Sequence, residues 1–387
     1  MKILICNELY APYFLGGAER SVTILAEALA QKGHQIYIYT TAPEDKNKES
    51  NNVKIFYRKC KNIYWIYSPN NPNKIKKTIW HLVDIYNISV RKQFQTLIEQ
   101  IKPDIIHTHV LSSFSVCLWS VAKKYNIPIV QTLRDYYLLC SKSTMFKDEH
   151  VCQKQCLLCK TSTYPKKILS SSVSAVVGIS QFILDTHIKN GYFAKTPLRQ
   201  VIFNSVSQKQ VSTNSSVREK AIGYIGRIHP SKGTEILIKS FLQIKNPQYK
   251  LYIAGNNTTE YAQYLQEKYN HPNILFLGLQ NSEEFLAKIS LLVVPSIWNE
   301  PFGRVIVEAF NCHCPVITSD RGGMPELITP KVNGDIFQIE NPTSLNILLQ
   351  NFNDGKTTYT IDDIPSQYSI ENMVLQYETL YKKVIYK

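Results

Sequence analysis

Two glutamates, Glu300 and Glu308, stand eight positions apart in the stretch SIWNEPFGRVIVEAF, residues 296–310. Because Glu300 precedes Pro301, its backbone is pushed toward extended geometry, and its carboxylate is expected on a loop. The apolar residues that follow Gly303 recur at helical spacing, so Glu308 is expected on a helix that begins beside that glycine. A glycine between a strand end and a helix N-terminus is typical of an anion site. The stretch therefore predicts a site for a phosphorylated ligand with hydroxyl groups on both sides.

Two cations follow a strand predicted at 221–226. Arg227 offers a planar fork for phosphate oxygens, and Lys232 offers a mobile point charge. Five residues separate them, which is far enough for a loop to bring both onto one pyrophosphate. Gly233 then admits the next helix. Combined with the helix start after Gly303, these residues predict a diphosphate site.

Polar side chains also end two strands of the first half. His107 and His109 alternate along an apolar strand, so both imidazoles are expected on one side, and His109, nearer the carboxyl end, is the better candidate for ligand contact. The alternative is a hydrogen-bonded interior histidine. Arg134 and Asp135 follow the next strand and could grip a donor phosphate or a sugar hydroxyl. Alternatively, Asp135 caps a helix and Arg134 is its surface neighbour.

Two glycine turns precede predicted helices. Gly16 and Gly17 follow the strand at 2–6, where backbone can approach a pyrophosphate closely, although such a turn can equally be structural. Residues 321–325 form a similar turn after the strand at 315–319, and Glu326 behind it could bind sugar or favour the helix start.

Four cysteines lie in a loop of about twenty residues, a length that has no core of its own. Cys140, Cys152, Cys156 and Cys159 could close a tetrahedral structural zinc site. Unpaired thiols and disulfides are the alternatives. Four thiolates leave no open coordination position, so the metal is given no catalytic role.

Length and patterning predict an α/β protein of two doubly wound domains, because 387 residues exceed one ordinary core and short apolar runs alternate with amphipathic segments. The domains are placed at 1–205 and 206–365, joined by a polar stretch near 204–218, with a final helix at 366–387 packing back across both. The strand-like runs are 2–6, 35–40, 53–57, 104–109, 127–132, 173–178, 200–203, 221–226, 250–254, 273–278, 291–295 and 315–319.

No apolar run approaches the length of a membrane span, and the N-terminus reads as a strand rather than a signal peptide. With nine cysteines, an odd number, this predicts a cytoplasmic protein.

The positive charge is confined to the first half of the chain. Residues 1–203 contain 27 Lys and Arg against 13 Asp and Glu, whereas the remainder contains 17 of each, so the first half accounts for the net charge of +14. Its densest part is 54–102. A basic surface of this kind indicates binding to nucleic acid, to an anionic membrane or to an anionic substrate. The alternative is a lysine-rich solvated surface.

The motifs in this order resemble those of glycosyltransferase family 4. The ordered set is Gly16-Gly17, Thr132 to Cys140, Gly226-Arg227 to Lys232-Gly233, Glu300-x7-Glu308, and Gly322-Gly323 with Pro325-Glu326. The resemblance runs from the first strand to the last helix. It implies the GT-B fold, in which two Rossmann-like doubly wound parallel-sheet domains face each other across a cleft. It also implies a retaining transferase that uses a nucleotide-sugar donor.

The resemblance assigns roles to matching positions. Arg227 and Lys232 would neutralise the donor diphosphate, Glu308 would hold the ribose, and Glu300 would contact the donor sugar near its reacting centre. Backbone N–H groups of the donor loop would bind phosphate and sugar, and Gly17, with Gly16, would approach the diphosphate from the other domain. The donor-loop residues are Phe302, Gly303, Arg304 and Val305.

One position departs from the family pattern. Many relatives with this Cys-rich loop carry histidine where this chain has Arg134, so the histidine that would lie against the donor sugar is absent. His109 then becomes the catalytic candidate beside Glu300, Arg227 and Lys232. Arg134 could instead meet the carboxylate of a sugar acid.

The predicted reaction moves a sugar from a UDP- or GDP-sugar to a hydroxyl of a saccharide or lipid-linked acceptor in bacterial surface polysaccharide synthesis. It needs no divalent metal, because the cations and the helix start hold the leaving diphosphate. The enzyme is expected on the inner face of the cytoplasmic membrane, in contact with anionic lipid. Alternatives are a GT-B nucleotide-sugar epimerase, a transferase to a small soluble metabolite, or a protein that binds nucleic acid through its basic half.

Overall fold

The computed structural model describes residues 1–13, 16–68, 72–206, 218–361 and 365–386. The chain forms two compact units. The first contains Met1–Met145, Cys152–Ser205 and Ile370–Lys387, and the second contains Phe146–Val151 and Val206–Ser369. The polar stretch predicted to join the two domains falls mainly on 207–217, which lies outside the described residues.

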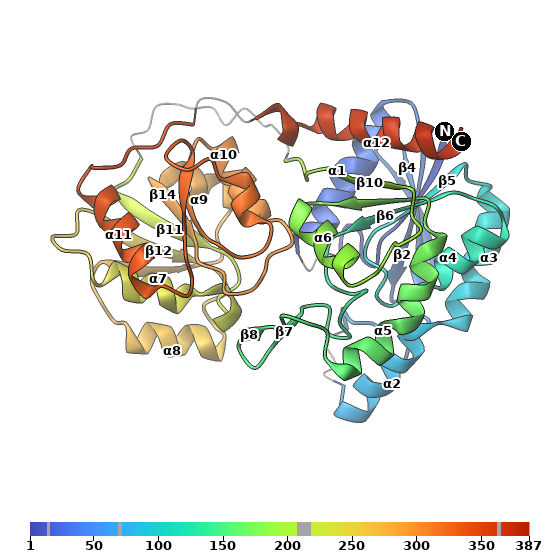
Figure 1. Ribbon diagram of the computed structural model, residues 1–387, viewed down its shortest axis with the longest axis horizontal. Coiled ribbons are helices and arrows are strands. Elements are labelled where there is room, and N and C mark those ends of the chain that lie inside the picture. The colour runs from blue at the N-terminus through green and yellow to red at the C-terminus, as the bar shows by residue number, and fades with distance from the viewer. Residues whose placement is uncertain (14–15, 69–71, 207–217, 362–364, 387) are drawn as a thin grey trace. The chain divides into compact units, whose positions relative to one another are not determined.

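The first unit is built on an eight-stranded sheet in the order β10-β9-β6-β5-β1-β2-β4-β3 (Figure 1). All neighbouring strands are parallel except β3, which runs antiparallel to β4. The strands are β1 (Lys2–Cys6), β2 (Gln35–Ala42), β3 (Lys46–Ser50), β4 (Val53–Lys59), β5 (Ile105–Thr108), β6 (Ile129–Leu133), β9 (Ala175–Gly178) and β10 (Leu198–Val201). Central strands such as β1 are buried along almost their whole length because helices cover both faces of a parallel sheet.

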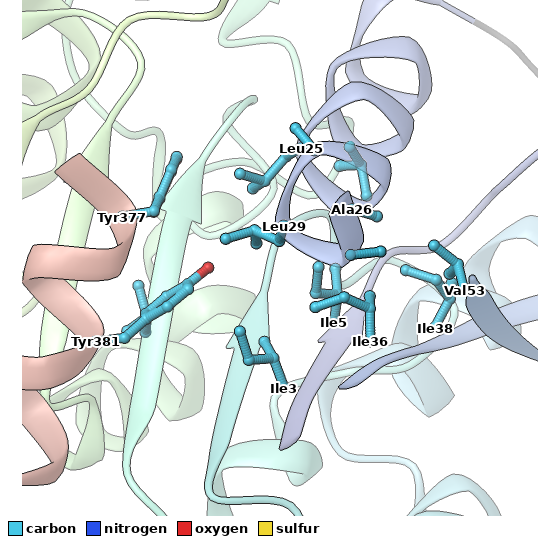
Figure 2. Close-up of a cluster of buried hydrophobic side chains, with 14 of the residues drawn as sticks. Ile3, Ile5, Leu25, Ala26, Leu29, Ile36, Ile38, Val53, Tyr377 and Tyr381 are labelled. Carbon is cyan, nitrogen blue, oxygen red and sulfur yellow. The ribbon is translucent and has the colours of Figure 1, made fainter. Parts of the chain in front are cut away.

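The helices of the first unit include the last helix of the chain. They are α1 (Gly17–Gln31), α2 (Lys74–Ile85), α3 (Ile88–Ile101), α4 (Cys117–Lys124), α5 (Leu157–Leu169), α6 (Gln181–Lys189) and α12 (Ile370–Ile385). Helix α12 packs beside α1, and Figure 2 shows its Tyr377 and Tyr381 pointing into the same core as Leu25 and Leu29 of α1. A segment nearly 370 residues from the N-terminus thus completes the first core.

The second unit has a six-stranded, all-parallel sheet in the order β13-β12-β11-β14-β15-β16. Its strands are β11 (Ala221–Ile225), β12 (Lys250–Ala254), β13 (Ile274–Gly278), β14 (Leu291–Val294), β15 (Val316–Ser319) and β16 (Gly334–Phe337). Its helices are α7 (Thr234–Phe241), α8 (Glu260–Lys268), α9 (Ser282–Lys288), α10 (Arg304–Asn311) and α11 (Pro342–Asn353). A short hairpin of β7 (Phe146–Lys147) and β8 (His150–Val151) groups with this unit.

These two doubly wound sheets confirm the predicted fold class, and each predicted strand-like run overlaps an observed strand, although 200–203 shares only its first two residues with β10. The sequence did not predict β3, β7, β8 and β16. Strand β3 is almost fully exposed and polar, so it carries no apolar run, and β7 and β8 have two residues each. Within the described residues, no helix combines the length and apolar character needed to span a bilayer.

Candidate active site

The candidate site of the second unit lies where the strand order reverses. Strands β11 and β14 are neighbours. From β11 the chain continues to β12 on one side of this pair, and from β14 it continues to β15 on the other side. Ligands of open α/β sheets bind outside the carboxyl ends of the strands at such a point. The loop after β11 carries Arg227 and Lys232, and the loop after β14 carries Glu300. The fold therefore brings together two motifs about 70 residues apart.

Backbone hydrogen bonds hold these loops in place. The N–H groups of Ile297 and Trp298 donate to the carbonyl of Ser231 at 2.9 and 3.0 Å, which ties the two loops together. The N–H of Gly323 donates to the carbonyl of Glu300 at 2.8 Å. The position of Glu300 is thus fixed by the turn after β15, a third predicted segment.

Two glycines permit this close contact. Gly233 (φ +69°) and Gly322 (φ +66°) have left-handed backbones. A Cβ at Gly233 would lie 1.9 Å from the Pro295 carbonyl oxygen, and one at Gly322 would lie 2.1 Å from the Glu300 carbonyl oxygen. Any side chain at either position would therefore push the loop after β14 out of place.

Lys232 and Glu300 form an ion pair at the centre of this arrangement. The Lys232 ammonium donates to Glu300 Oε1, and both side chains are largely withdrawn from solvent. The same ammonium lies 4.9 Å from the centroid of the Trp298 ring, within the range of a cation–π interaction. Trp298 was not predicted from the sequence, although a tryptophan two residues before the candidate glutamate is a usable signal.

Arg227 is exposed on the loop between β11 and the short helix Pro230–Lys232. Partial burial lowers the pKa of neighbouring His229, and the positive charges of Arg227 and Lys232 lower it further. Both cations therefore raise the electrostatic potential of the same loop. Such a potential favours an anionic ligand at this edge of the sheet.

Helix α10 begins directly after Gly303, whose backbone is left-handed (φ +92°), as the apolar spacing predicted. Phe302 is buried beside this start. Arg304 Nε donates to Glu308 Oε1 at 2.8 Å, and Ser282 Oγ donates to Glu308 Oε2 at 2.9 Å. Both carboxylate oxygens of Glu308 are thus oriented by protein groups, and Ser282 is a further residue that the sequence did not single out.

The other predicted residues of this unit lie nearby in the fold. Val305 is half-buried in the first turn of α10, and Glu326 is exposed on the short helix Met324–Leu327 after the Gly322 turn. The second unit therefore gathers two cations, two oriented carboxylates and the N-terminus of a helix at one sheet edge. This arrangement can hold a phosphorylated ligand and bind its hydroxyl groups.

A second group of predicted residues lies at the carboxyl ends of β5 and β6 in the first unit. His107 is an interior histidine with both ring nitrogens within 2.7 Å of a hydroxyl oxygen, those of Tyr381 and Thr132. Its ring lies 4.0 Å from that of His109, so the two imidazoles share one side of the sheet as predicted. His109 lies nearer the end of the strand and contacts other groups.

Arg134 fixes the protonation state of His109. Arg134 Nε donates to His109 Nδ1 at 3.0 Å, and Arg134 Nη1 donates to Asn204 Oδ1 at 2.6 Å. Burial lowers the pKa of His109 well below its usual range, and the charges of His107 and Arg134 lower it further. A neutral imidazole that accepts at Nδ1 carries its proton on Nε2. This buried Nε2–H has no hydrogen-bond partner in the described residues.

Asp135 and Glu8 complete the polar edge of the first unit. Asp135 Oδ1 accepts from the N–H of Tyr137 at 3.0 Å, and burial raises its pKa to about 6. Glu8, two residues beyond β1, accepts hydrogen bonds from the hydroxyls of Ser112 and Ser113. Burial raises its pKa to about 8, against the smaller lowering effect of these hydroxyls. Applying the strand-end rule to the first strand would have found Glu8.

Gly16 and Gly17 are both exposed at the start of α1. The Gly16 N–H donates to Glu19 Oε2 at 3.0 Å, so one of the helix's first N–H groups is used within the chain. Among the described residues, a Cβ at Gly16 would meet only that carboxylate oxygen, at 4.0 Å.

The four-cysteine loop brings three of its thiols together. Cys159 contacts the thiols of Cys140 and Cys156, and burial raises its pKa to about 11. The nine cysteines, all within the described residues, form no disulfide. Across the described ranges, no three His, Cys, Asp or Glu side chains are arranged to hold a metal ion. Structural zinc in this loop stays a prediction.

Comparisons with known proteins agree with this architecture. The profile of the family described as "Glycosyltransferase Family 4" matches residues 15–201, and that of "Glycosyl transferases group 1" matches residues 206–358. An uncharacterized 42.6 kDa protein from the cps region of Klebsiella pneumoniae is 35% identical over 372 residues, which cover 95% of this chain and 98% of the relative.

Two solved structures share the fold over nearly the whole chain. Anabaena HepE, solved with UDP and glucose, superposes with a TM-score of 0.71 at 21% identity and covers 99% of this chain and 100% of HepE. The lipopolysaccharide outer core galactosyltransferase WaaB, in its apo form, has a TM-score of 0.67 at 16% identity, with coverage of 99% and 100%.

The two parallel-sheet units, with the site at the strand-order reversal of the second unit, define a GT-B glycosyltransferase. The chain belongs to glycosyltransferase family 4, group 1.

Proposed function

We propose that this enzyme transfers a sugar from a nucleotide-diphosphate sugar to a hydroxyl of a saccharide or lipid-linked acceptor, with retention of the anomeric configuration. The observation that carries the proposal is the meeting of Arg227, Lys232, Glu300 and the start of α10 at one sheet edge. Two cations and a helix N-terminus suit a diphosphate, and the oriented carboxylates suit the hydroxyls of ribose and sugar. The UDP bound to HepE fits the same donor class.

The residues of the second unit have distinct roles in this proposal. Arg227 and Lys232 neutralise the leaving diphosphate, and Glu308, already oriented by Arg304, accepts from the ribose hydroxyls. Glu300 contacts the donor sugar near its reacting carbon. The N–H groups of Gly303, Arg304 and Val305 at the start of α10 bind phosphate and sugar oxygens. These fixed charges stabilise the diphosphate as it develops charge, which is the main requirement for leaving-group departure.

In the proposed reaction the acceptor oxygen forms a bond to the anomeric carbon as the bond from that carbon to the diphosphate oxygen breaks. The acceptor attacks from the face that the diphosphate leaves, and a phosphate oxygen of the leaving group takes the acceptor's proton. The bond to the sugar is thus replaced on the same face. An NMR analysis of the anomeric configuration of the product tests this, and an inverted product would contradict it.

We place the acceptor in bacterial surface polysaccharide synthesis at the inner face of a membrane. The relative from a cps region and the lipopolysaccharide galactosyltransferase WaaB support this placement. The excess positive charge of residues 1–203 supports contact with anionic lipid.

The donor is identified by thermal shift with a panel of UDP-, GDP- and ADP-sugars. A ligand at 100 times its dissociation constant adds about 2.7 kcal/mol of stability. Stabilisation by one sugar nucleotide, followed by product formation only when an acceptor is added, supports the transferase. Conversion of the donor without any acceptor would favour the epimerase instead.

A further inference from the structure

Helix α2 exposes its apolar stripe to solvent. Ile75, Ile79 and Leu82 follow one another at intervals of four and three residues, so they share one helix face, and their side chains are 70%, 42% and 62% exposed. The buried residues of the helix, Trp80 and Asp84, lie on the opposite face. The fully buried side chains of α2 are thus one tryptophan and one aspartate, whereas three of its aliphatic side chains are exposed; Val83 and Ile85 are half-buried.

Helix α5 repeats this arrangement. Leu157, Tyr164 and Ile168 share a face at intervals of seven and four residues and are exposed, whereas Thr163 and Lys166 are buried on the opposite side. Of the 17 large apolar side chains exposed in the described ranges, seven lie on these two helices. The two helices hold only 25 residues, so the exposed apolar surface is concentrated there.

A buried ion pair joins the two helices through their inward faces. Lys166 of α5 lies 4.0 Å from the carboxylate of Asp84 of α2, and both are almost fully buried. Tyr137 fills the space between them, because its hydroxyl donates to the Asp84 carbonyl at 3.1 Å and the Lys166 ammonium lies 3.2 Å from the centroid of its ring. Helices anchored in this way keep their apolar stripes exposed.

Lysines border both stripes. Lys74 and Lys76 flank the stripe of α2, Lys160 and Lys167 flank that of α5, and all four are exposed. A helix with an apolar face edged by lysines and too short to cross a bilayer is typical of a segment that lies in the membrane interface. An acidic protein surface would match the lysines but not the aliphatic stripes.

We propose that these two helices form a docking surface for an anionic lipid membrane. In this proposal the stripes of both helices contact the same membrane, and their apolar residues, Ile75, Ile79, Leu82, Leu157, Tyr164 and Ile168, are called the α2–α5 face. Its apolar side chains enter the boundary between headgroups and acyl chains, and the bordering lysines bind lipid phosphates. The inference rests on the proposed function, in that a membrane-bound first unit would place the enzyme beside a lipid-linked acceptor.

The test is co-sedimentation of the full chain with vesicles. Phosphatidylcholine vesicles with and without phosphatidylglycerol separate the electrostatic and apolar contributions. We expect binding to the mixed vesicles, and at least about tenfold weaker binding by an Ile75→Ser, Leu82→Ser double variant. The matched control is Ile347→Ser, Leu375→Ser, which removes side chains of similar exposure from α11 and α12 and should bind as wild type.

A second pair of variants separates lysine position from net charge. Lys74→Gln with Lys76→Gln should weaken binding about fivefold for each charge removed. Lys123→Gln with Lys124→Gln, two exposed lysines of α4, removes the same charge away from the α2–α5 face and should have a much smaller effect.

Binding of UDP and GDP to the same proteins, measured by thermal shift, distinguishes the two proposals. Vesicle binding that is absent from wild type, or unaffected by the α2–α5 variants, overturns the docking surface even if a nucleotide still binds. Vesicle binding without any nucleotide binding contradicts the proposed function but keeps the docking surface. A dimer that dissociates in the Ile75→Ser, Leu82→Ser variant would identify a second copy as the occupant and would also overturn the inference.

Discussion

Lys232 and Glu300, 68 positions apart in the chain, form one ion pair, and the Lys232 ammonium also lies over the Trp298 ring. The cation proposed for the donor diphosphate and the carboxylate proposed for the donor sugar therefore hold each other in position. A diphosphate that binds Lys232 must compete with Glu300 for the same ammonium. This competition gives the first prediction.

Replacing Glu300 with Gln should separate donor binding from transfer. The isosteric amide releases Lys232 toward phosphate, so the affinity for UDP or GDP should be unchanged or higher. The sugar contact loses its charge, and transfer should fall by about two orders of magnitude or more. Lys232→Ala should instead weaken nucleoside diphosphate binding. Isothermal titration and a transfer assay on both variants check this, and weaker nucleotide binding by Glu300→Gln would contradict it.

Gly322→Ala should destabilise the second unit and impair the site. The new Cβ would lie 2.1 Å from the carbonyl oxygen of Glu300, so the loop carrying that residue must move. We expect a loss of about 3 kcal/mol or more in unfolding free energy, together with weaker nucleotide binding.

Gly355→Ala is the matched control for that variant. Gly355 has nearly the same backbone angle (φ +69°), but a Cβ there would meet no described residue within 4 Å. Only the backbone strain of about 1 kcal/mol should appear, with normal nucleotide binding. Equal losses in the two variants, measured by denaturant unfolding, would show that contact with Glu300 does not matter.

His109 should remain neutral with its proton on Nε2, because Arg134 can only donate to Nδ1. Nitrogen–proton correlation spectra of histidine-labelled protein should show this tautomer with no titration between about pH 5 and 8. In Arg134→Ala the pKa of His109 should rise, since a neighbouring positive charge is removed. Exposed His229 serves as the internal reference, and a proton on Nδ1 of His109 in the wild-type protein would refute the assignment.

Glu8 should make the first unit less stable as pH rises. Its pKa in the fold is about 8, above its ordinary value of 4.5, so the folded state retains a proton that the unfolded state loses between these values. Stability should therefore fall across this window, and Glu8→Gln should remove part of the fall. The variant should gain about 1 to 4 kcal/mol relative to wild type between pH 5 and pH 8.

Two neighbouring carboxyls also affect the pH dependence, so the Glu8→Gln variant has to be compared with wild type at each pH. Burial also raises the pKa of Asp84 to about 7 and that of Asp135 to about 6, so both contribute falls of the same sign. Glu49→Gln, a change at an exposed carboxylate of β3, is the control for the loss of one negative charge. A pH-independent difference between Glu8→Gln and wild type would contradict the prediction.

Transfer should persist after removal of divalent cations. The proposed site supplies Arg227, Lys232 and the start of α10 for the charge of the leaving diphosphate, so EDTA should reduce the rate less than twofold. Arg227→Ala should reduce it far more, by about two orders of magnitude. Loss of activity in EDTA, restored by magnesium, would show that a metal shares this charge.

The order of motifs and the strand pattern could be predicted from sequence because both depend on local rules. Apolar runs mark buried parallel strands, glycines mark the turns behind them, and polar residues such as Arg227 and Glu300 follow the strand ends. Glu8 carries the same strand-end signal but was missed, because its burial and its serine partners are not visible in the sequence. Ser282 has no local signal, since it is significant only because Glu308 lies beside it.

Helix α2 shows where periodicity is insufficient. The spacing of Ile75, Ile79 and Leu82 alone would indicate the buried face, yet the fold buries Trp80 and Asp84 instead. Periodicity identifies a helix face, but the orientation of that face depends on which partners it meets. Here the partner is Lys166, more than 80 positions away.

The sequence by itself thus determined the fold class and the segments that form the site. Tertiary structure decided the pairings: Lys232 with Glu300, Arg134 with His109, and Asp84 with Lys166. The physical reason is that strand order brings together loops that are remote in the chain, and the charge state and hydrogen bonding of each group depend on those neighbours.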